Sequence, residues 1–206
     1  MRQRTDSKRQ DIINIARDAF LKSGYAATSM ASIAASVGGS KGTLYGYFPS
    51  KEELFSAVVR GVGEEHVLPM LHKLDLDDDT TSINTTLTDL SQTLINFLVL
   101  PQAIASYRLA VAEAGRFPHL GIAFYESGKR VGERHIARWM ARQMLKGRLK
   151  QGDADIMAKQ FIALCEVGPY QQMLLGRAEA PSAPEKDALA DLAVSTFLAA
   201  YGSGLD

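Results

Sequence analysis

Residues 28–54 read TSMASIAASVGGSKGTLYGYFPSKEEL, a stretch that predicts two short helices, the turn between them and the start of a third helix. Thr28 or Ser29 can cap the first of these helices with its hydroxyl group. Gly38-Gly39 ends it, because glycine accepts the left-handed turn that closes many helices. Apolar side chains recur along it at i, i+3, i+4 and i+7: Met30, Ile33, Ala34 and Val37.

A second short helix is expected over residues 41–47, with Ser40 as its cap. Leu44 falls on the side that packs against the preceding helix. The outward positions carry lysine, glycine and hydroxyl groups: Lys41, Gly42, Thr43, Tyr45 and Tyr47. Ser50 and Glu53 form an S-x-x-E capping box that opens the next helix.

Two interpretations of this helix pair stay open on spacing alone. In the first, it lies on DNA: lysine and hydroxyl groups contact phosphate, the helix starts at Thr28 and Ser40 favour anions, and Gly42 permits close approach to base edges. In the second, it is an exposed helical hairpin whose tyrosines only pack. The residue types favour DNA binding.

The segment V-G-G-S-K-G-T-L-Y-G-Y-F-P-S-K-E-E-L resembles the signature of TetR-type transcriptional regulators, and the likeness extends over roughly residues 8–68. In that family the helix that begins near Ser40 is the recognition helix. The resemblance implies phosphate contacts from four residues: Thr28, Tyr45, Tyr47 and Lys51. It implies base-facing positions at three: Lys41, Gly42 and Thr43. Gly46 departs from the family, in which a larger residue often stands there.

Basic residues cluster at the start of the chain, around a first helix that Ser7 and Gln10 can cap. The cluster contains Arg2, Arg4, Lys8 and Arg9. It is either a flexible arm that reaches DNA or an ordinary solvated terminus.

The chain has 206 residues, 46% of them hydrophobic, and a formal net charge of zero. Residues 1–60 hold nine Lys/Arg against five Asp/Glu, so the basic part coincides with the predicted helix pair. Cys165 is single, which excludes an internal disulfide, and no apolar secretion signal follows the early arginines. The apolar run 94–100 is too short to span a membrane. We therefore expect a cytoplasmic protein with no membrane contact.

Helical periodicity continues to the C-terminus, so the sequence predicts an all-α fold. Further helices are expected at 83–98, 101–115, 118–147, 153–176 and 185–202. The chain is expected to divide into a three-helix helix-turn-helix domain, a connecting fourth helix and a helical regulatory and dimerisation bundle, at 1–50, 51–68 and 69–206. The acidic connector 75–81 lacks the glycine and glutamate of a calcium loop, so we expect no metal and no cofactor.

Residues 107–126, YRLAVAEAGRFPHLGIAFYE, resemble the C-terminal region of AefR-like TetR regulators, which implies a helical regulatory domain. Large, soft side chains of this half suit a pocket for a small apolar or aromatic effector, or alternatively an ordinary core. The pocket candidates are Tyr107, Phe117, Phe124, Trp139, Met140, Met144, Phe161, Cys165 and Tyr170.

Two late helices carry apolar and small side chains on several faces, which favours an isologous four-helix dimer interface. The interface candidates are Phe161, Leu164, Gly168, Leu189, Leu192, Ala193, Phe197 and Ala200. The alternative is that these helices close the core of the monomer.

Together with these residues, the resemblance implies a TetR-type regulator: a ligand-released repressor that binds a palindromic double-stranded DNA operator as a homodimer. Two other classes are weighed against it. A helical adaptor would bind protein instead of DNA. An enzyme would use Cys165 as nucleophile, but the four histidines lack metalloenzyme spacing and no catalytic residue is expected.

Overall fold

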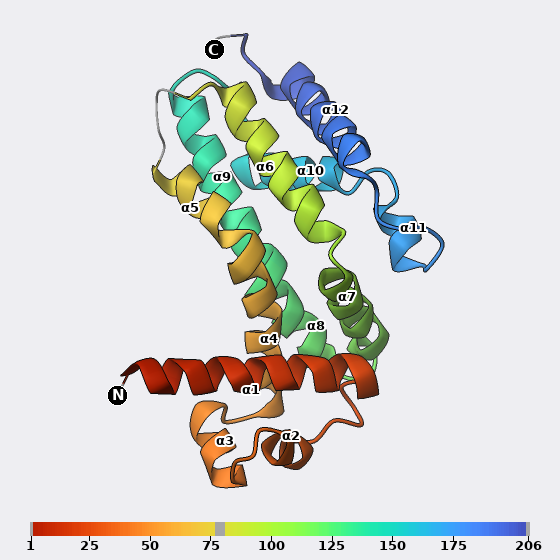
Figure 1. Cartoon of the computed structure of the whole chain (residues 1–206). Helices are drawn as coiled ribbons and strands as arrows, with labels where there is room; N and C mark the ends of the chain where they lie inside the picture. Colours follow the sequence, from red (N-terminus) through yellow and green to blue (C-terminus); the bar gives the residue numbers. More distant parts are fainter. Residues whose placement is uncertain (1, 77–80, 205–206) are drawn as a thin grey trace. The chain divides into compact units, whose positions relative to one another are not determined.

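The computed structural model describes residues 2–76 and 81–204, with side chains from Asp6 onward. Across these residues the fold is all-helical, as predicted (Figure 1). The one extended pairing among them is an isolated antiparallel bridge between Leu149 and Gly202. Most of the acidic connector, at 77–80, lies outside the described residues, as do the side chains of Arg2 and Arg4.

Packing divides the chain into two compact units that do not follow chain order. The first unit is Met1–Val62 with Ala105–Lys129, and the second is Gly63–Ile104 with Arg130–Asp206. This differs from the expected division at residue 68, because residues 105–129 pack with the N-terminal helices. Leu120 shows the reason: it is fully buried in the same apolar cluster as Phe20 and Phe55.

The first unit is built around three aromatic rings. Its elements are α1 (Arg2–Ser23), α2 (Met30–Ser36), α3 (Lys41–Tyr47), most of α4 (Lys51–His66), most of α7 (Pro101–Ala114), α8 (Pro118–Phe124) and the π-helical turn η1 (Tyr125–Lys129). The rings of Phe20, Tyr25 and Phe55 lie with centroids 5.5–5.8 Å apart. Helix α1 begins before Ser7, the residue expected to cap it.

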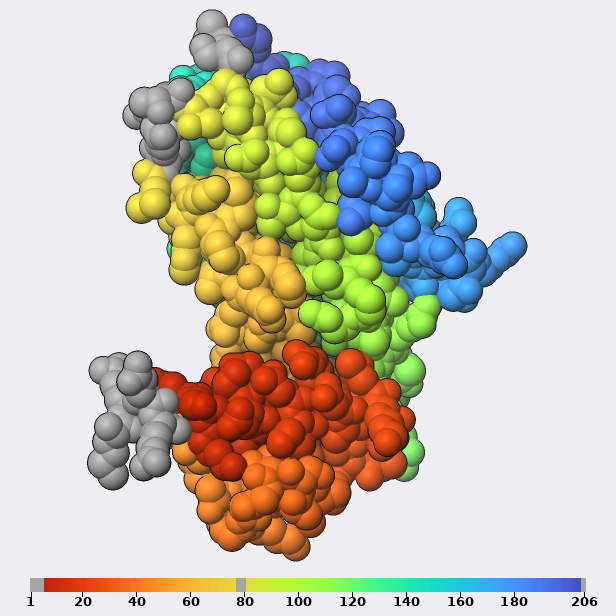
Figure 2. All heavy atoms as spheres, viewed as in Figure 1, coloured from red at the N-terminus to blue at the C-terminus, as the bar shows by residue number. Residues whose placement is uncertain are grey.

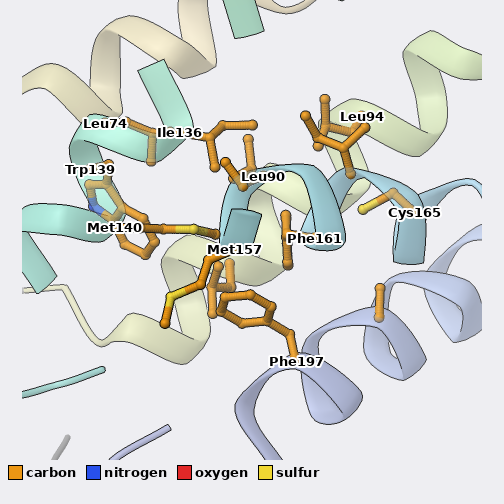
Figure 3. Close-up of a cluster of buried hydrophobic side chains, with 14 of the residues drawn as sticks. Leu74, Leu90, Leu94, Ile136, Trp139, Met140, Met157, Phe161, Cys165 and Phe197 are labelled. Carbon is orange, nitrogen blue, oxygen red and sulfur yellow. The ribbon is translucent and has the colours of Figure 1, made fainter. Parts of the chain in front are cut away.

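The second unit encloses the larger apolar core. Its elements are the end of α4, α5 (Leu68–Leu76), α6 (Ile83–Leu98), the start of α7, α9 (Arg130–Leu145), α10 (Ala154–Cys165), α11 (Tyr170–Leu174) and α12 (Ala183–Tyr201). Side chains from α5, α6, α9, α10 and α12 meet there (Figure 3). Phe161 and Phe197 pack edge to face with ring centroids 5.2 Å apart.

Two of the expected helices are interrupted. The helix expected over 118–147 is helical from Pro118 to Leu145 but contains the π-helical turn η1, where Gly128 approaches α4 so closely that an added Cβ would lie 3.2 Å from a methyl group of Val59. The helix expected over 153–176 ends at Cys165, and Gly168 then adopts a φ of +98°. Pro169 follows this turn as the N-cap of α11.

None of the described helices is, by itself, both long and apolar enough to cross a membrane. Helices α6 and α7, taken together across the bend between them, reach the required length and composition. The apolar face of α6 is buried in the core of the second unit.

Candidate nucleic-acid interface

Helix α2 begins at a cap formed by Ser29. Its Oγ accepts a hydrogen bond from Ser32 N at 3.0 Å, and Ser32 Oγ accepts one from Ser29 N at 3.2 Å, which completes a capping box. Thr28, before the cap, is buried and donates its hydroxyl to Gly24 O at 2.8 Å and Ala19 O at 3.2 Å. Because this hydroxyl is used inside the protein, its placement does not support the phosphate contact implied for Thr28.

The turn after α2 is a Schellman motif. Gly38 adopts a φ of +67°, a conformation that favours glycine. The N–H groups of Gly38 and Gly39 donate to Ala35 O and Ala34 O, both at 3.1 Å. These bonds satisfy the last carbonyl groups of α2 and set the direction in which α3 starts.

Helix α3 is anchored by one fully buried side chain, Leu44, which is 2% exposed. At its start, Ser40 Oγ accepts from Thr43 N at 3.1 Å and lies 2.9 Å from Thr43 Oγ1. Tyr47 is half-buried against the core. The other outward positions are exposed, as expected: Lys41, Gly42, Thr43 and Tyr45. Residues 25–50, coloured orange in Figure 2, form part of the outer surface of the first unit.

The start of α4 is hydrogen-bonded to the loop between α1 and α2. Ser50 Oγ accepts from Glu53 N at 3.1 Å, which is one half of the expected capping box. The ammonium group of Lys51 donates to Tyr25 O at 2.8 Å and to Thr28 O at 2.9 Å. It also lies 4.0 Å from the centroid of the Tyr25 ring. Lys51, implied to hold phosphate, therefore has its ammonium group directed at the protein.

Ionisable side chains from α4, α7 and α8 surround Tyr25. Its phenol donates to Glu52 Oε1 at 3.0 Å, and His119 Nε2 lies 3.4 Å from the same oxygen. A hydrogen bond from the backbone N–H of Glu52 lowers the pKa of that carboxyl group, helped by Tyr25 and His119. Burial, and then Glu52, raise the pKa of Tyr25. Burial lowers the pKa of Lys51, while Glu52 and Glu113 oppose this effect.

Two residues of the N-terminal basic cluster have structural partners that the sequence analysis did not predict. Lys8 Nζ donates to Val37 O at 3.0 Å, so a cation from α1 lies at the C-terminal end of α2. The Arg9 guanidinium lies 5.1 Å from the centroid of the Phe48 ring. The 29-residue separation of Lys8 and Val37 explains why local pattern did not reveal this contact.

The exposed residues of α2 and α3 are suited to a polyanion. They combine the hydroxyl groups of Ser29, Thr43 and Tyr45, the ammonium of Lys41, and Gly42, which lets a backbone come close. Among the described residues, no group of three or more His, Cys, Asp or Glu is placed to hold a metal ion.

Comparison with protein families assigns both parts of the chain. Residues 12–58 match the model of the bacterial regulatory proteins of the tetR family, and residues 85–203 match the AefR-like transcriptional repressor, C-terminal domain. The chain belongs to the TetR family of transcriptional regulators.

Solved structures agree with this assignment. A TetR-family regulator from Mesorhizobium loti MAFF303099 is 30% identical, with a TM-score of 0.82 over 97% of this chain and 98% of that one. The flavonoid-responsive regulator FrrA is 27% identical, with a TM-score of 0.76 over 97% of this chain and 100% of that one. A TetR regulator from Agrobacterium tumefaciens is 26% identical, with a TM-score of 0.72 over 95% of each chain. No curated protein matches the chain.

Membership of the TetR family decides between the classes of function considered above. The family is one of regulators and not of enzymes, and it implies a DNA operator and a small-molecule effector as partners. The AefR-like region predicted at 107–126 falls inside the matched repressor domain.

The nine pocket candidates of this TetR-family chain belong to different packing clusters. Tyr107, Phe117 and Phe124 belong to the first unit, where Tyr107 and Phe124 pack with ring centroids 5.8 Å apart. Tyr170 lies in a small separate cluster with Ile104. Helices α7 and α8 pack with the DNA-binding helices in the first unit, and a pocket formed from these residues stays a prediction.

Five of the pocket candidates fill the core of the second unit, and each is at most 6% exposed. They are Trp139, Met140, Met144, Phe161 and Cys165. Burial raises the pKa of the Cys165 thiol to about 12, so this side chain behaves as a buried apolar group.

The eight dimer candidates also separate. Three are 0–1% exposed within the monomer core and are not available to a partner: Phe161, Ala193 and Phe197. Gly168 has an internal role, since its φ is +98° and an added Cβ would lie 2.9 Å from Leu189 Cδ2. Leu164 and Leu189 are half-buried, whereas Leu192 and Ala200 are exposed. The periodicity of the sequence identified these helices, but it did not show which of their faces is buried within the monomer.

Proposed function

We propose that this TetR-family regulator is a ligand-released repressor that binds a palindromic operator as a homodimer, with α3 in the major groove. The observation that carries the proposal is the state of α3, which is capped at Ser40, anchored by Leu44 and otherwise exposed. Lys41, Gly42 and Thr43 face the bases. Ser29, Tyr45 and Tyr47 face phosphate oxygens.

The second copy docks on the outer faces of α10 and α12. Both helices keep large apolar side chains in solvent: Ile156 is 47% exposed and Leu192 is 54% exposed. Val167, just after α10, is 48% exposed. Burying these side chains against the same residues of a partner forms an isologous interface. The two recognition helices then lie about 34–36 Å apart, one turn of DNA.

The effector is a small apolar or aromatic molecule. FrrA, which is 27% identical over 97% of this chain, is described as flavonoid-responsive, and flavonoids belong to that chemical class. The effector releases DNA by binding more tightly to a conformation whose recognition helices do not match the groove spacing. Because the operator is chromosomal DNA, the protein works in the cytoplasm.

Anisotropy titrations against DNA from its own promoter, at several salt concentrations, test the proposal. We expect log Kd to depend linearly on log salt, and Lys41→Met to lower the slope by about 1.8, because each of the two copies loses one cation from the DNA surface at about 0.9 apiece. Lys73→Met is the matched control, because Lys73 is also exposed but lies on α5, outside both proposed surfaces. Binding that is indifferent to salt and to DNA sequence would support the adaptor and refute the regulator.

A matched experiment addresses the dimer. Leu192→Glu places a charge in the proposed interface, so sedimentation should show a monomer where the unsubstituted chain is a dimer. Leu145→Glu is the control, since Leu145 is 86% exposed at the end of α9. Equal dimerisation of both variants would exclude this interface.

A further inference from the structure

We propose that Lys51 works inside the protein, where it fixes the loop between α1 and α2, and that Glu113 of α7 is the second contact that fixes this loop. The inference rests on the DNA-binding role proposed above and assigns two positioning residues to it. Lys51 and Glu113 are called the loop clamp below.

The loop at residues 24–29 has few backbone partners of its own. It leaves α1 through Gly24, whose φ is +80° and whose N–H donates to Phe20 O at 3.0 Å. It ends at Ser29, the cap of α2 that we place on phosphate. The position of this loop therefore determines where the start of α2 meets the DNA backbone.

Side chains from elements distant in sequence hold the loop. Lys51 Nζ donates to Tyr25 O at 2.8 Å and to Thr28 O at 2.9 Å, and it lies over the Tyr25 ring. Ala26 N donates to Glu113 Oε1 at 3.4 Å. The lysine thus binds two carbonyl groups of the loop, and the glutamate accepts from an N–H group between them.

Lys51 cannot use the same N–H groups for a phosphate. Two of the three donors of its ammonium are directed at carbonyl oxygens, and its charge lies 4.0 Å from the centre of an aromatic face. Lys41 on α3, by contrast, is exposed. The two lysines therefore have different tasks, although both lie in the helix-turn-helix region.

Glu113 connects the clamp to a segment outside the DNA-binding sequence. It lies on α7, in the part of the chain that matches the repressor domain at 85–203. Its carboxylate is also 3.7 Å from where a Cβ on Gly24 would stand. Operator affinity therefore depends on a residue that never reaches DNA.

Four variants test the clamp in the full chain. We expect Lys51→Met to weaken operator binding about tenfold at fixed salt and to leave the salt slope unchanged, because hydrogen bonds to a charged group are lost but no phosphate contact is. Lys41→Met should instead lower the slope by about 1.8, because each of the two copies loses one cation from the DNA surface. Glu113→Ala should weaken binding several-fold, whereas Glu113→Gln should preserve it, since the amide oxygen still accepts from Ala26 N.

Amide hydrogen exchange of the DNA-free protein supplies an independent readout. Exchange at residues 24–29 should accelerate in Lys51→Met and Glu113→Ala, and it should be unchanged in Lys41→Met and Glu113→Gln. If Lys51→Met does not fold, the test uses Glu113→Ala, Glu113→Gln and Lys51→Arg. The arginine can donate to both carbonyl groups, so Lys51→Arg should keep the loop exchange of the unsubstituted chain.

A salt slope that falls equally in Lys51→Met and Lys41→Met, with unchanged loop exchange, would overturn the inference. So would equal loop exchange in Glu113→Ala and Glu113→Gln. If the unsubstituted chain binds no operator, the proposed function fails, but the exchange measurement still tests the clamp.

Discussion

Substitution of Leu44 by alanine should detach the recognition helix without unfolding the protein. Leu44 is 2% exposed and is the one residue of α3 that is fully buried. A helix of seven residues is not stable alone in water, so docking of this side chain supplies most of what holds α3 in place.

The expected loss of docking free energy in Leu44→Ala follows from the burial of Leu44 and the helix propensity of α3. Removing a buried leucine side chain costs about 2–5 kcal/mol. The intrinsic stability of helix α3 is low, because Gly42 and Gly46 each weaken it by about 1 kcal/mol relative to alanine. A loss of about 3 kcal/mol in docking lowers the apparent operator affinity by up to roughly a hundredfold, since only the docked fraction binds.

The assay combines operator titration with hydrogen exchange of α3 and the thermal transition of the second unit. Gly46→Ala is the matched second-site variant, because a Cβ at Gly46 meets no atom within 4 Å. In the Leu44→Ala background it should restore about fivefold of the protection of α3 amides. If Gly46→Ala protects α3 but weakens operator binding, the helix approaches DNA at this glycine.

Unchanged operator affinity in Leu44→Ala would refute this account of α3. An equal loss of structure in both units would also refute it, since Leu44 belongs only to the apolar cluster of the first unit.

Three further substitutions or reactions follow from the geometry. Cys165, with a pKa of about 12 and 3% exposure, should react with a thiol reagent at pH 8 about a thousandfold more slowly than a free cysteine until the protein unfolds. The lowered pKa of Glu52 means that its stabilisation is present above the ordinary value of 4.5 and is lost as the pH falls through the folded value, so Glu52→Gln should flatten the acid limb of the stability curve. Leu120→Ala should destabilise the first unit by about 2–5 kcal/mol, as Leu90→Ala should the second, and exchange measured for each unit checks this difference.

The helix-turn-helix was predictable because its determinants are local. Ser40, Leu44 and Gly38 act within a few residues of their own positions, so caps, periodicity and turn residues identify them. The expected helix at 83–98 matches α6 residue for residue, since it too has a local cap and a regular apolar face.

The roles of individual polar residues were less predictable, because they depend on contacts between distant segments. From the sequence, Lys51 is expected to be a solvated cation. No neighbouring residue in the sequence indicates that its ammonium group binds the carbonyl oxygens of Tyr25 and Thr28. The same limit applies to Phe161 and Phe197, whose helices were identified while the inward direction of their side chains was not. Periodicity defines faces, but only packing decides what covers them.

The division of the molecule into units follows from the same physics. Sequence models separate the chain into 12–58 and 85–203, yet residues 105–129 of the second range pack with the first. Leu120 is fully buried among the aromatic residues of the DNA-binding helices, and Glu113 accepts a hydrogen bond from their first loop. A change in α7 or α8 therefore alters the DNA-binding unit directly, because these helices are part of its core.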